Sequence, residues 1–325
     1  MATVFKTLLT NDVAMTRTLL NEAIPITGSV VSSSTYADSN IKNYTHGLFE
    51  SVYDYPYPSS SANHIFDITY GYSTSSDGAT NIQDTDKRNI YNQMAQILVG
   101  YDGTGSIRRF DSDGDFFGTS AASGVMDSCI FINYSRLLVK DEIKKGQYTF
   151  TTTGGVTIGD YGANEEYRVN SPAGEFGLLY TSSVDPYGDS VGLLYYQAGI
   201  AVITGSTDVF PNAPEYTGSY SISGAADDVR TVWEDNDFQN TTELNSTIYF
   251  CRATNSEYNY SANQTYLNGS EIVVKNNNID KPPVTYITTV GLYSADNELL
   301  AVAKLSEPIK KDPATELIFR VRLDY

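Results

Sequence analysis

An acidic triplet, Asp111, Asp113 and Asp115, is the motif in the 325-residue chain whose spacing most resembles a metal-binding loop. Carboxylates at alternating positions can converge on Ca²⁺ when the backbone coils around the ion. An EF-hand loop places its glycine after such a triplet and a glutamate six positions later. Here Gly114 lies inside the triplet, and Thr-Ser-Ala at 119–121 stands where glutamate is needed. The spacing favours a turn between strands, with a calcium loop as the alternative, and we expect no bound metal.

His46 and His64 are the two histidines of the chain. Neither belongs to an H-E-x-x-H motif, and no G-x-S-x-G nucleophile elbow accompanies them. The Gly-Thr-Gly stretch at 103–105 is too short for G-x-G-x-x-G, and no P-loop motif occurs. We therefore expect structural histidines, no catalytic or cofactor-binding residues, no cofactor and no enzymatic activity. A hydrolase that uses scattered carboxylates is the alternative.

Two pairs of neighbouring acids, Glu165–Glu166 and Asp227–Asp228, could in principle supply paired carboxylates for glycoside chemistry. Neighbours in a strand point to opposite faces, and a catalytic pair needs a defined separation in space. Acids in polar stretches usually remain in water. The sequence favours solvated loop charge for both pairs.

Tyrosine alternates with other residues in Tyr-Asp-Tyr-Pro-Tyr-Pro at 53–58, which predicts an extended, stiff segment that presents aromatic rings. This segment is either a loop folded onto its own domain or an arm that docks on a neighbour.

The apolar stretch 195–203 predicts a central or interfacial strand. Cys129 and Cys251 match no zinc motif or disulfide framework, so we expect two buried thiols.

The composition favours contacts with proteins over contacts with polyanions. The chain has 21 Lys+Arg against 39 Asp+Glu, a formal net charge of -18, which disfavours nucleic-acid binding and docking on anionic membranes. An apolar content of 41% is too high for intrinsic disorder, and the charged content of 18% is low. With 26 tyrosines, such a surface suits a β-rich protein that meets other proteins.

Hydrophobic periodicity predicts a mainly β (β-rich α+β) fold of antiparallel sheets or a sandwich with two or three short helices. The expected helices cover 11–24, which Pro25 ends, and 86–99. Near the C-terminus, Leu317, Phe319, Val321, Leu323 and Tyr325 alternate with polar residues, with Ile318 as the one exception, and predict one buried strand face. Further strands are expected at 64–72, 130–139, 175–182, 191–204, 245–253, 284–293 and 298–305.

The domain organisation has two possible solutions. The Gly/Thr/Asn-rich segment 148–172 suggests a division into an N-terminal domain with helices, 1–147, and a C-terminal β domain, 148–325. Alternatively, 1–70 and 270–325 form one sheet and the middle of the chain is an insertion. Pro308 is expected to break the chain after a hairpin whose turn is at Asp296–Asn297.

Five stretches resemble virion structural proteins of contractile-tailed phages, especially environmental, cyanophage-type relatives of the T4-like group. The last forty residues are the most specific part. They contain the stretch 286–305, in which Ile-Thr-Thr-Val-Gly-Leu-Tyr-Ser-Ala-Asp-Asn-Glu-Leu-Leu-Ala-Val-Ala at 287–303 is similar to segments of baseplate and tail-fibre-attachment proteins. The others are 93–102, 137–146, 240–253 and 306–310. The resemblance covers about half the chain and implies a particle component without a catalytic site.

The resulting expectation is a tail or baseplate subunit that mediates assembly or fibre attachment through protein–protein contacts. Its expected partners are baseplate, tail, fibre or neck proteins and further copies of itself, with no nucleic acid and no membrane insertion. The alternatives are a neck, collar or head-associated structural protein and a module that binds host-surface carbohydrate. No secretion signal or apolar span is evident, so the chain is expected to be made in the host cytoplasm and to reside in the virion.

Overall fold

The computed structural model describes residues 5–32, 38–73, 82–117, 124–184, 187–260, 267–269, 271–272 and 284–325. The chain forms two compact units. Unit 1 comprises Met1–Leu19 and Glu243–Tyr325, and unit 2 comprises Leu20–Thr242.

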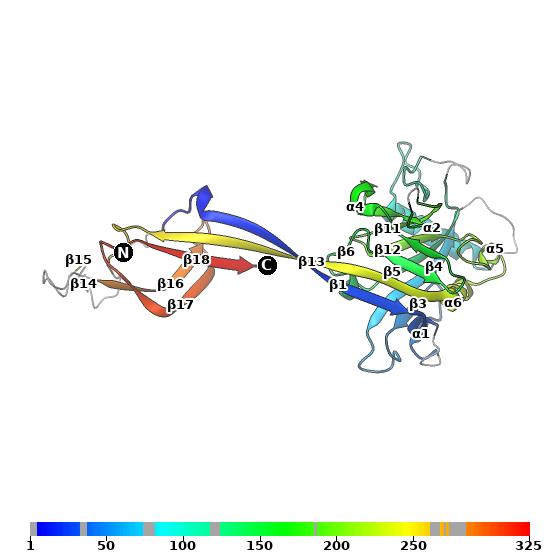
Figure 1. Ribbon diagram of the computed structural model, residues 1–325, viewed down its shortest axis with the longest axis horizontal. Coiled ribbons are helices and arrows are strands. Elements are labelled where there is room, and N and C mark those ends of the chain that lie inside the picture. Colours follow the sequence, from blue (N-terminus) through cyan, green and yellow to red (C-terminus); the bar gives the residue numbers. More distant parts are fainter. Residues whose placement is uncertain are drawn as a thin grey trace. The chain divides into compact units, whose positions relative to one another are not determined.

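The elements of both units are shown in Figure 1. The helical elements are η1 (Thr10–Asp12), α1 (Gly28–Val31), α2 (Asp84–Leu98), α3 (Arg136–Val139), α4 (Ala163–Glu166), α5 (Ala213–Tyr216) and α6 (Ile222–Val232). The strands are β1 (Val13–Thr27), β2 (Ile41–Asn43), β3 (Glu50–Tyr53), β4 (His64–Tyr72), β5 (Ser128–Tyr134), β6 (Glu142–Ile143), β7 (Thr149–Thr152), β8 (Thr157–Gly159), β9 (Arg168–Ser171), β10 (Gly174–Tyr180), β11 (Ser190–Tyr195), β12 (Ile200–Thr204), β13 (Trp233–Ala253), β14 (Leu267–Asn268), β15 (Glu271–Ile272), β16 (Thr285–Tyr293), β17 (Leu299–Lys311) and β18 (Leu317–Asp324). The mainly β fold with antiparallel sheets is confirmed.

The unit boundaries differ from both divisions expected from the sequence. Residues 147 and 148 lie in the same unit, because β6 and β7 on either side of this junction both pair with β13. As in the discontinuous alternative, the two ends of the chain lie in one unit. The bounds of that alternative differ, since residues 20–70 belong to unit 2 and residues 243–269 belong to unit 1.

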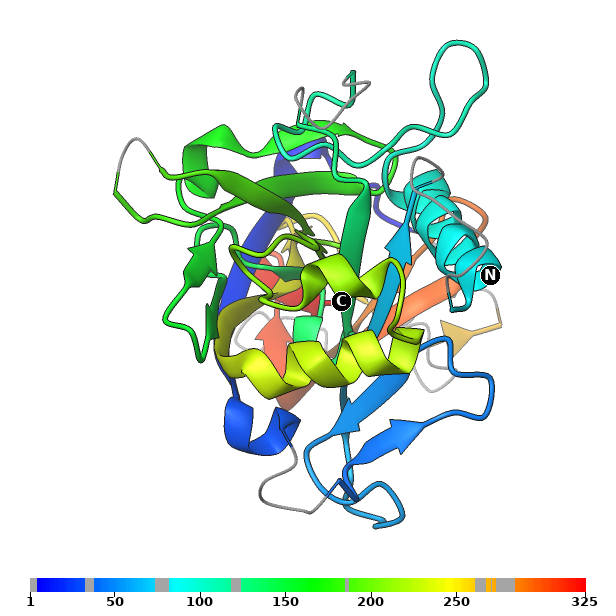
Figure 2. The ribbon, with the colours of Figure 1, turned by 90° about the vertical axis from the view of Figure 1, so that its right-hand side faces the viewer.

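Unit 2 is built on one antiparallel sheet whose central strands are buried on both faces. Its strands run in the order β13-β7-β8-β10-β11-β12-β5-β4-β3-β2. On β5, Ile130 and Ile132 belong to one core cluster, whereas Cys129 and Phe131 belong to the other. This alternation is the period of two expected for a strand. The helices follow it, because α6 contributes to the first cluster and α2 to the second, and Figure 2 shows both helices.

The stretch 195–203 is central, as expected, but forms the ends of two antiparallel strands instead of one strand. Tyr195 ends β11, Ile200 begins β12, and the two residues are partners in the ladder. Gly199 between them has a φ of 67°. This left-handed conformation favours glycine and permits the reversal.

The helix expected at 86–99 is confirmed as α2, which lies against β4 at Gly71. A Cβ atom on Gly71 would lie 2.8 Å from both the Lys87 carbonyl oxygen and the Tyr91 amide nitrogen. These are backbone atoms of α2, which cannot move aside as a flexible side chain can. The close approach of the helix to the sheet therefore requires glycine at this position.

We expect Gly71→Ala to lower the free energy of unfolding of unit 2 by about 1–3 kcal/mol, as overpacking of a well-filled core does. Urea unfolding followed by circular dichroism measures the change. Gly103→Ala is the matched control, since a Cβ atom there meets nothing within 4 Å. Equal stability of the two variants would contradict the close approach.

The helix expected at 11–24 is wrong, because β1 occupies this segment and pairs with β13. The residues that suggested an apolar helix face, among them Met15, Leu19 and Leu20, are exposed. Pairing with a long strand outweighs a weak helical pattern, since local propensity contributes only tenths of a kcal/mol per residue. Pro25 is tolerated in β1, which the structure pairs with another strand on one side alone.

Unit 1 contains the expected C-terminal strand and hairpin. β18 pairs antiparallel with β13 from Ala253–Leu317 to Ser246–Asp324, and β16 pairs with β17 around the expected turn. Pro308 does not end β17. Pro308 lies in a bulge of the β16–β17 ladder, between the pair Ile287–Ile309 and the pair Thr289–Lys304. A residue in such a bulge need not donate a backbone hydrogen bond to the ladder, so proline is tolerated there.

Candidate functional site

The acidic triplet is a turn in which the three carboxylates lie close together. One carboxylate oxygen from each of Asp111, Asp113 and Asp115 can be chosen so that all lie within 4.8 Å of one another. The Asp113 amide donates to Asp111 Oδ1 at 3.3 Å, and the Asp115 amide donates to Asp113 Oδ1 at 3.0 Å. Burial, followed by the charges of Asp113 and Asp115, raises the pKa of Asp111 to about 6. The expected turn is therefore present.

We expect the thermal unfolding curves in EDTA and in millimolar Ca²⁺ to coincide. The triplet offers three carboxylates, whereas Ca²⁺ takes about six to eight oxygen ligands. Differential scanning calorimetry measures both midpoints. A calcium-dependent rise in the midpoint that Asp113→Asn removes would identify the triplet as a calcium loop.

The two histidines belong to an aromatic cluster of unit 2, defined by Tyr44, His46, Phe49, Tyr53, Tyr57 and His64. The His46 ring stacks on Tyr44 with centroids 5.2 Å apart, and its Nδ1 accepts from the Leu48 amide at 3.1 Å. The His64 Nε2 lies 2.8 Å from Asp67 Oδ1. In the part of the chain that the structure describes, neither histidine joins a group of three potential metal ligands.

The Tyr/Pro segment at 53–58 is held on its own unit. The Tyr57 amide donates to the Ser39 carbonyl at 3.1 Å, and the rings of Tyr53 and Tyr57 lie 6.2 Å apart. The ammonium group of Lys42 lies 4.8 Å from the centroid of Tyr44 and 6.0 Å from that of Tyr57. The segment thus forms part of the aromatic cluster, and the Tyr57 ring is partly open to solvent.

The two acidic pairs lie on helices instead of loops. Glu165 and Glu166 are exposed on α4, which agrees with solvated charge. Asp227 and Asp228 are on α6, where they have separate partners. Asp227 pairs with Arg230, and Asp228 accepts from Asn212 at 2.7 Å and from the Tyr216 hydroxyl. The prediction of loop charge for Asp227–Asp228 is therefore wrong, because both acids anchor the helix.

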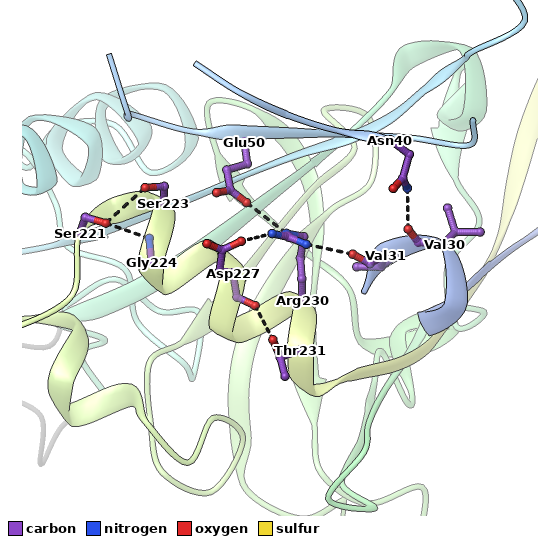
Figure 3. A network of polar contacts seen from close by, with 10 residues as sticks. All are labelled: Val30, Val31, Asn40, Glu50, Ser221, Ser223, Gly224, Asp227, Arg230 and Thr231. Carbon is purple, nitrogen blue, oxygen red and sulfur yellow. Dashed lines mark hydrogen bonds and ion pairs between the residues drawn. The ribbon is translucent and has the colours of Figure 1, made fainter. Parts of the chain in front are cut away.

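Arg230 is the centre of a buried polar network that joins α6 to β3 and α1 (Figure 3). Its Nε donates to Glu50 Oε2 at 3.1 Å, and one terminal nitrogen donates to the Val31 carbonyl oxygen at 3.2 Å. Glu50 and Arg230 are both buried. Burial raises the pKa of Glu50 to about 7, although the Arg230 charge acts in the opposite direction. The network therefore fixes α6, β3 and α1 to one another.

The cysteines differ in environment. Cys129 is buried in unit 2, as expected, whereas Cys251 of unit 1 is only half-buried. Burial raises the pKa of both thiols. Neither is therefore activated as a nucleophile.

A cavity of about 960 Å³ lies within unit 1. Its walls come from the N-terminal segment, β13, the hairpin β16–β17 and β18. Among its lining residues are Phe5, Asp12, Tyr249, Cys251, Arg252, Tyr258, Tyr260, Tyr286, Leu300, Phe319 and Leu323. The cavity is partly open to solvent, and Phe319 and Leu323 in its lining are only partly covered. The strands of unit 1 therefore pack against one another incompletely.

The burial of side chains leads to the same conclusion. The buried members of both described core clusters lie between residues 26 and 238, within unit 2. In the described part of unit 1, the buried apolar residues are Ile248, Ala253 and Val321. Leu317, Phe319 and Leu323, which were expected on a buried face, are only partly covered, and Tyr325 is exposed. The alternation is present, but the face lacks a complete cover.

Unit 1 also exposes apolar side chains, which we term the apolar set: Leu299, Leu300, Val302, Ile318 and Tyr325. Its charge is nearly balanced, with 10 basic and 11 acidic residues, whereas unit 2 has 11 basic and 28 acidic residues. The net charges are therefore -1 and -17. The acidic character of the chain belongs almost entirely to unit 2.

Sequence reasoning missed this surface, although two signals were available. The run Leu-Leu-Ala-Val at 299–302 is apolar at every position, which an edge hairpin cannot bury on both faces without a partner. In addition, the charge differs between the ends and the middle of the chain.

Neither a family model, nor a curated protein, nor a solved structure matches this chain. No helix in the described ranges has the length and apolarity needed to cross a membrane.

Proposed function

We propose that this protein is a virion structural protein of a contractile-tailed phage, a tail or baseplate subunit that mediates assembly or fibre attachment through protein–protein contacts. The observation that carries the assembly role is the incomplete packing of unit 1, with its cavity and its exposed apolar set. The proposed role is structural and requires no catalytic residue.

Physical chemistry supports a partner for unit 1. Burial of a large apolar side chain contributes roughly 1.5–3 kcal/mol. The apolar set alone therefore represents a stabilisation comparable with the whole stability of a typical domain, about 5–15 kcal/mol. A contact that covers this set yields free energy that the isolated unit cannot gain.

The phage assignment is supported by the sequence resemblance. The most specific stretch, 287–303, lies on the hairpin β16–β17, and 306–310 continues along β17. Both stretches belong to unit 1, the unit whose packing calls for a partner. Neck, collar and head positions use the same kind of contact and are the alternative locations within the particle.

Mass spectrometry of purified particles of the phage that encodes this chain tests the proposal. We expect the protein at a fixed copy number, cross-linked to tail or baseplate proteins. A nonsense mutation in its gene should yield particles with defective tails. Particles that lack the protein yet are complete and infectious would overturn the proposal.

Binding of host-surface carbohydrate is a second candidate, and the aromatic cluster of unit 2 favours it. Tyr57 is partly exposed, and the Lys42 ammonium group lies beside its ring, so that a sugar could stack on an aromatic face next to a hydrogen-bond donor. A glycan array with the wild type and Tyr57→Ala tests this candidate. Loss of a specific signal in the variant would support it, and the absence of any signal in the wild type would reject it.

A further inference from the structure

We infer that unit 1 is a self-association module, in which unit 1 of one copy covers the apolar set of another copy. This inference rests on the proposed assembly function and names the partner for its interface.

The partner must be a macromolecule and not a small ligand. The cavity of about 960 Å³ has Leu300 among its lining residues, but Val302 and Ile318 lie outside the lining. A small molecule that filled the cavity would leave these two side chains in water. Phe319 and Leu323 line the cavity, whereas Ile318 points to the opposite face of β18, because side chains alternate along a strand. Only a macromolecule is large enough to cover exposed side chains on both faces.

The charge of unit 1 favours a second copy as that protein. Two copies of unit 1, each with a net charge of -1, meet with almost no net repulsion, whereas two copies of unit 2, each at -17, repel strongly. Association through unit 1 is therefore the contact between copies with the lowest electrostatic cost.

The positions of the charges within unit 1 are also suited to pairing between copies. Exposed Glu298 and Lys304 flank the hairpin residues Leu299–Val302, and exposed Glu316 and Arg320 flank Ile318 on β18. Each apolar patch thus has one charge of each sign beside it. Contact of the hairpin patch of one copy with the β18 patch of another would pair Glu298 with Arg320 and Lys304 with Glu316 at the rim of an apolar contact.

Sedimentation equilibrium of the full-length protein alone tests the inference. We expect the wild type to form a homo-oligomer, and the double variant Leu300→Lys/Ile318→Lys to weaken association at least 100-fold. Both side chains are exposed, at 68% and 63%, so the substitutions leave the fold of the single chain intact. Circular dichroism checks this, and Tyr325→Ser at the exposed C-terminal residue provides a second, milder variant expected to weaken association in the same direction.

The matched control is Ile97→Lys/Leu137→Lys, which places the same charges on exposed apolar residues of unit 2, at 65% and 75% exposure. This control should retain the oligomer of the wild type. A wild type that remains monomeric at high concentration would overturn the inference, as would a folded Leu300→Lys/Ile318→Lys variant that associates normally or a control that dissociates equally.

The failure of the inference and that of the proposed function are distinguishable. A monomeric protein that is nevertheless found in particles would overturn self-association and leave the virion role in place. An oligomer that depends on unit 1 but is absent from particles would support the module and overturn the virion role.

Discussion

Trp233→Ala is expected to destabilise unit 2 by about 3–5 kcal/mol, the usual cost of truncating a large buried aromatic side chain. The Trp233 ring is parallel to that of Phe66 with centroids 4.8 Å apart, and it meets Phe150 edge-on at 4.7 Å. Its Nε1 donates to the Ile26 carbonyl oxygen at 3.3 Å. Truncation leaves a cavity among these rings and removes the indole donor from the Ile26 carbonyl oxygen. A loss of this size removes a large part of the stability of a typical domain.

Chemical denaturation followed by far-ultraviolet circular dichroism measures this loss, because the variant no longer contains the only tryptophan of the chain. Trp233→Phe should cost less, since a phenyl ring retains part of the stacking. Tyr57→Ala, at a ring that is 45% exposed, is the surface control and should change stability by about 0.5 kcal/mol or less. Similar losses for Trp233→Ala and Tyr57→Ala would contradict the role given to Trp233.

Arg230→Met is expected to destabilise unit 2 by about 3–5 kcal/mol near neutral pH, because buried Glu50 loses its counter-charge and must either remain an unpaired carboxylate or take up a proton. The Val31 carbonyl oxygen loses a donor at the same time. The double variant Glu50→Leu/Arg230→Met should be closer to the wild type, since it removes both charges from the interior. Urea unfolding of the single and double variants gives the coupling between the two residues.

Ionisation of Glu50 is expected to lower the free energy of unfolding as the pH rises. The pKa of Glu50 is about 7 in the folded protein against an ordinary value of 4.5, so the folded state binds more protons than the unfolded state between these values. Stability therefore falls as the pH rises from about 4.5 to about 7. Because a tenfold difference in proton affinity is worth about 1.4 kcal/mol, Glu50 contributes a loss of up to about 3 kcal/mol. Asp160, whose pKa burial raises to about 6, acts in the same direction.

Glu50→Gln should flatten this pH dependence, and Arg230→Met should steepen it, because loss of the guanidinium raises the pKa of Glu50 further. Unfolding free energies at pH 5 and pH 8 measure both effects. Gly103→Ala, which removes no ionisable group and adds a Cβ atom with nothing within 4 Å, is a control that should leave the wild-type slope unchanged. If all four proteins have the same slope, Glu50 is not the group responsible.

The sequence predicted the features that depend on local pattern. The strand at 64–72 and the C-terminal strand alternate with a period of two, and α2 has a helical period with Gly100 after its end. Each of these elements is present. The turn at 111–115 was likewise predictable, because glycine within a run of aspartates disfavours most other structures.

Features that depend on pairing between distant residues were not predictable in this way. β1 carries a weak helical pattern, yet it is extended because β13, more than two hundred residues later, supplies its ladder. The pairing of Arg230 with Glu50 joins residues 180 positions apart. The surface of unit 1 was missed for a related reason, because an alternating strand shows which face is apolar but not whether the molecule contains anything to cover it.

The different environments of the two cysteines allow Cys251 to be labelled as a probe of unit 1. Cys129 is enclosed in unit 2, whereas Cys251 is half-buried and lines the cavity of unit 1. A thiol-reactive fluorophore or spin label would therefore modify the folded chain at Cys251 in preference to Cys129. The rate of that labelling, and the polarity that the label senses, would then follow the filling of the cavity without any engineered residue.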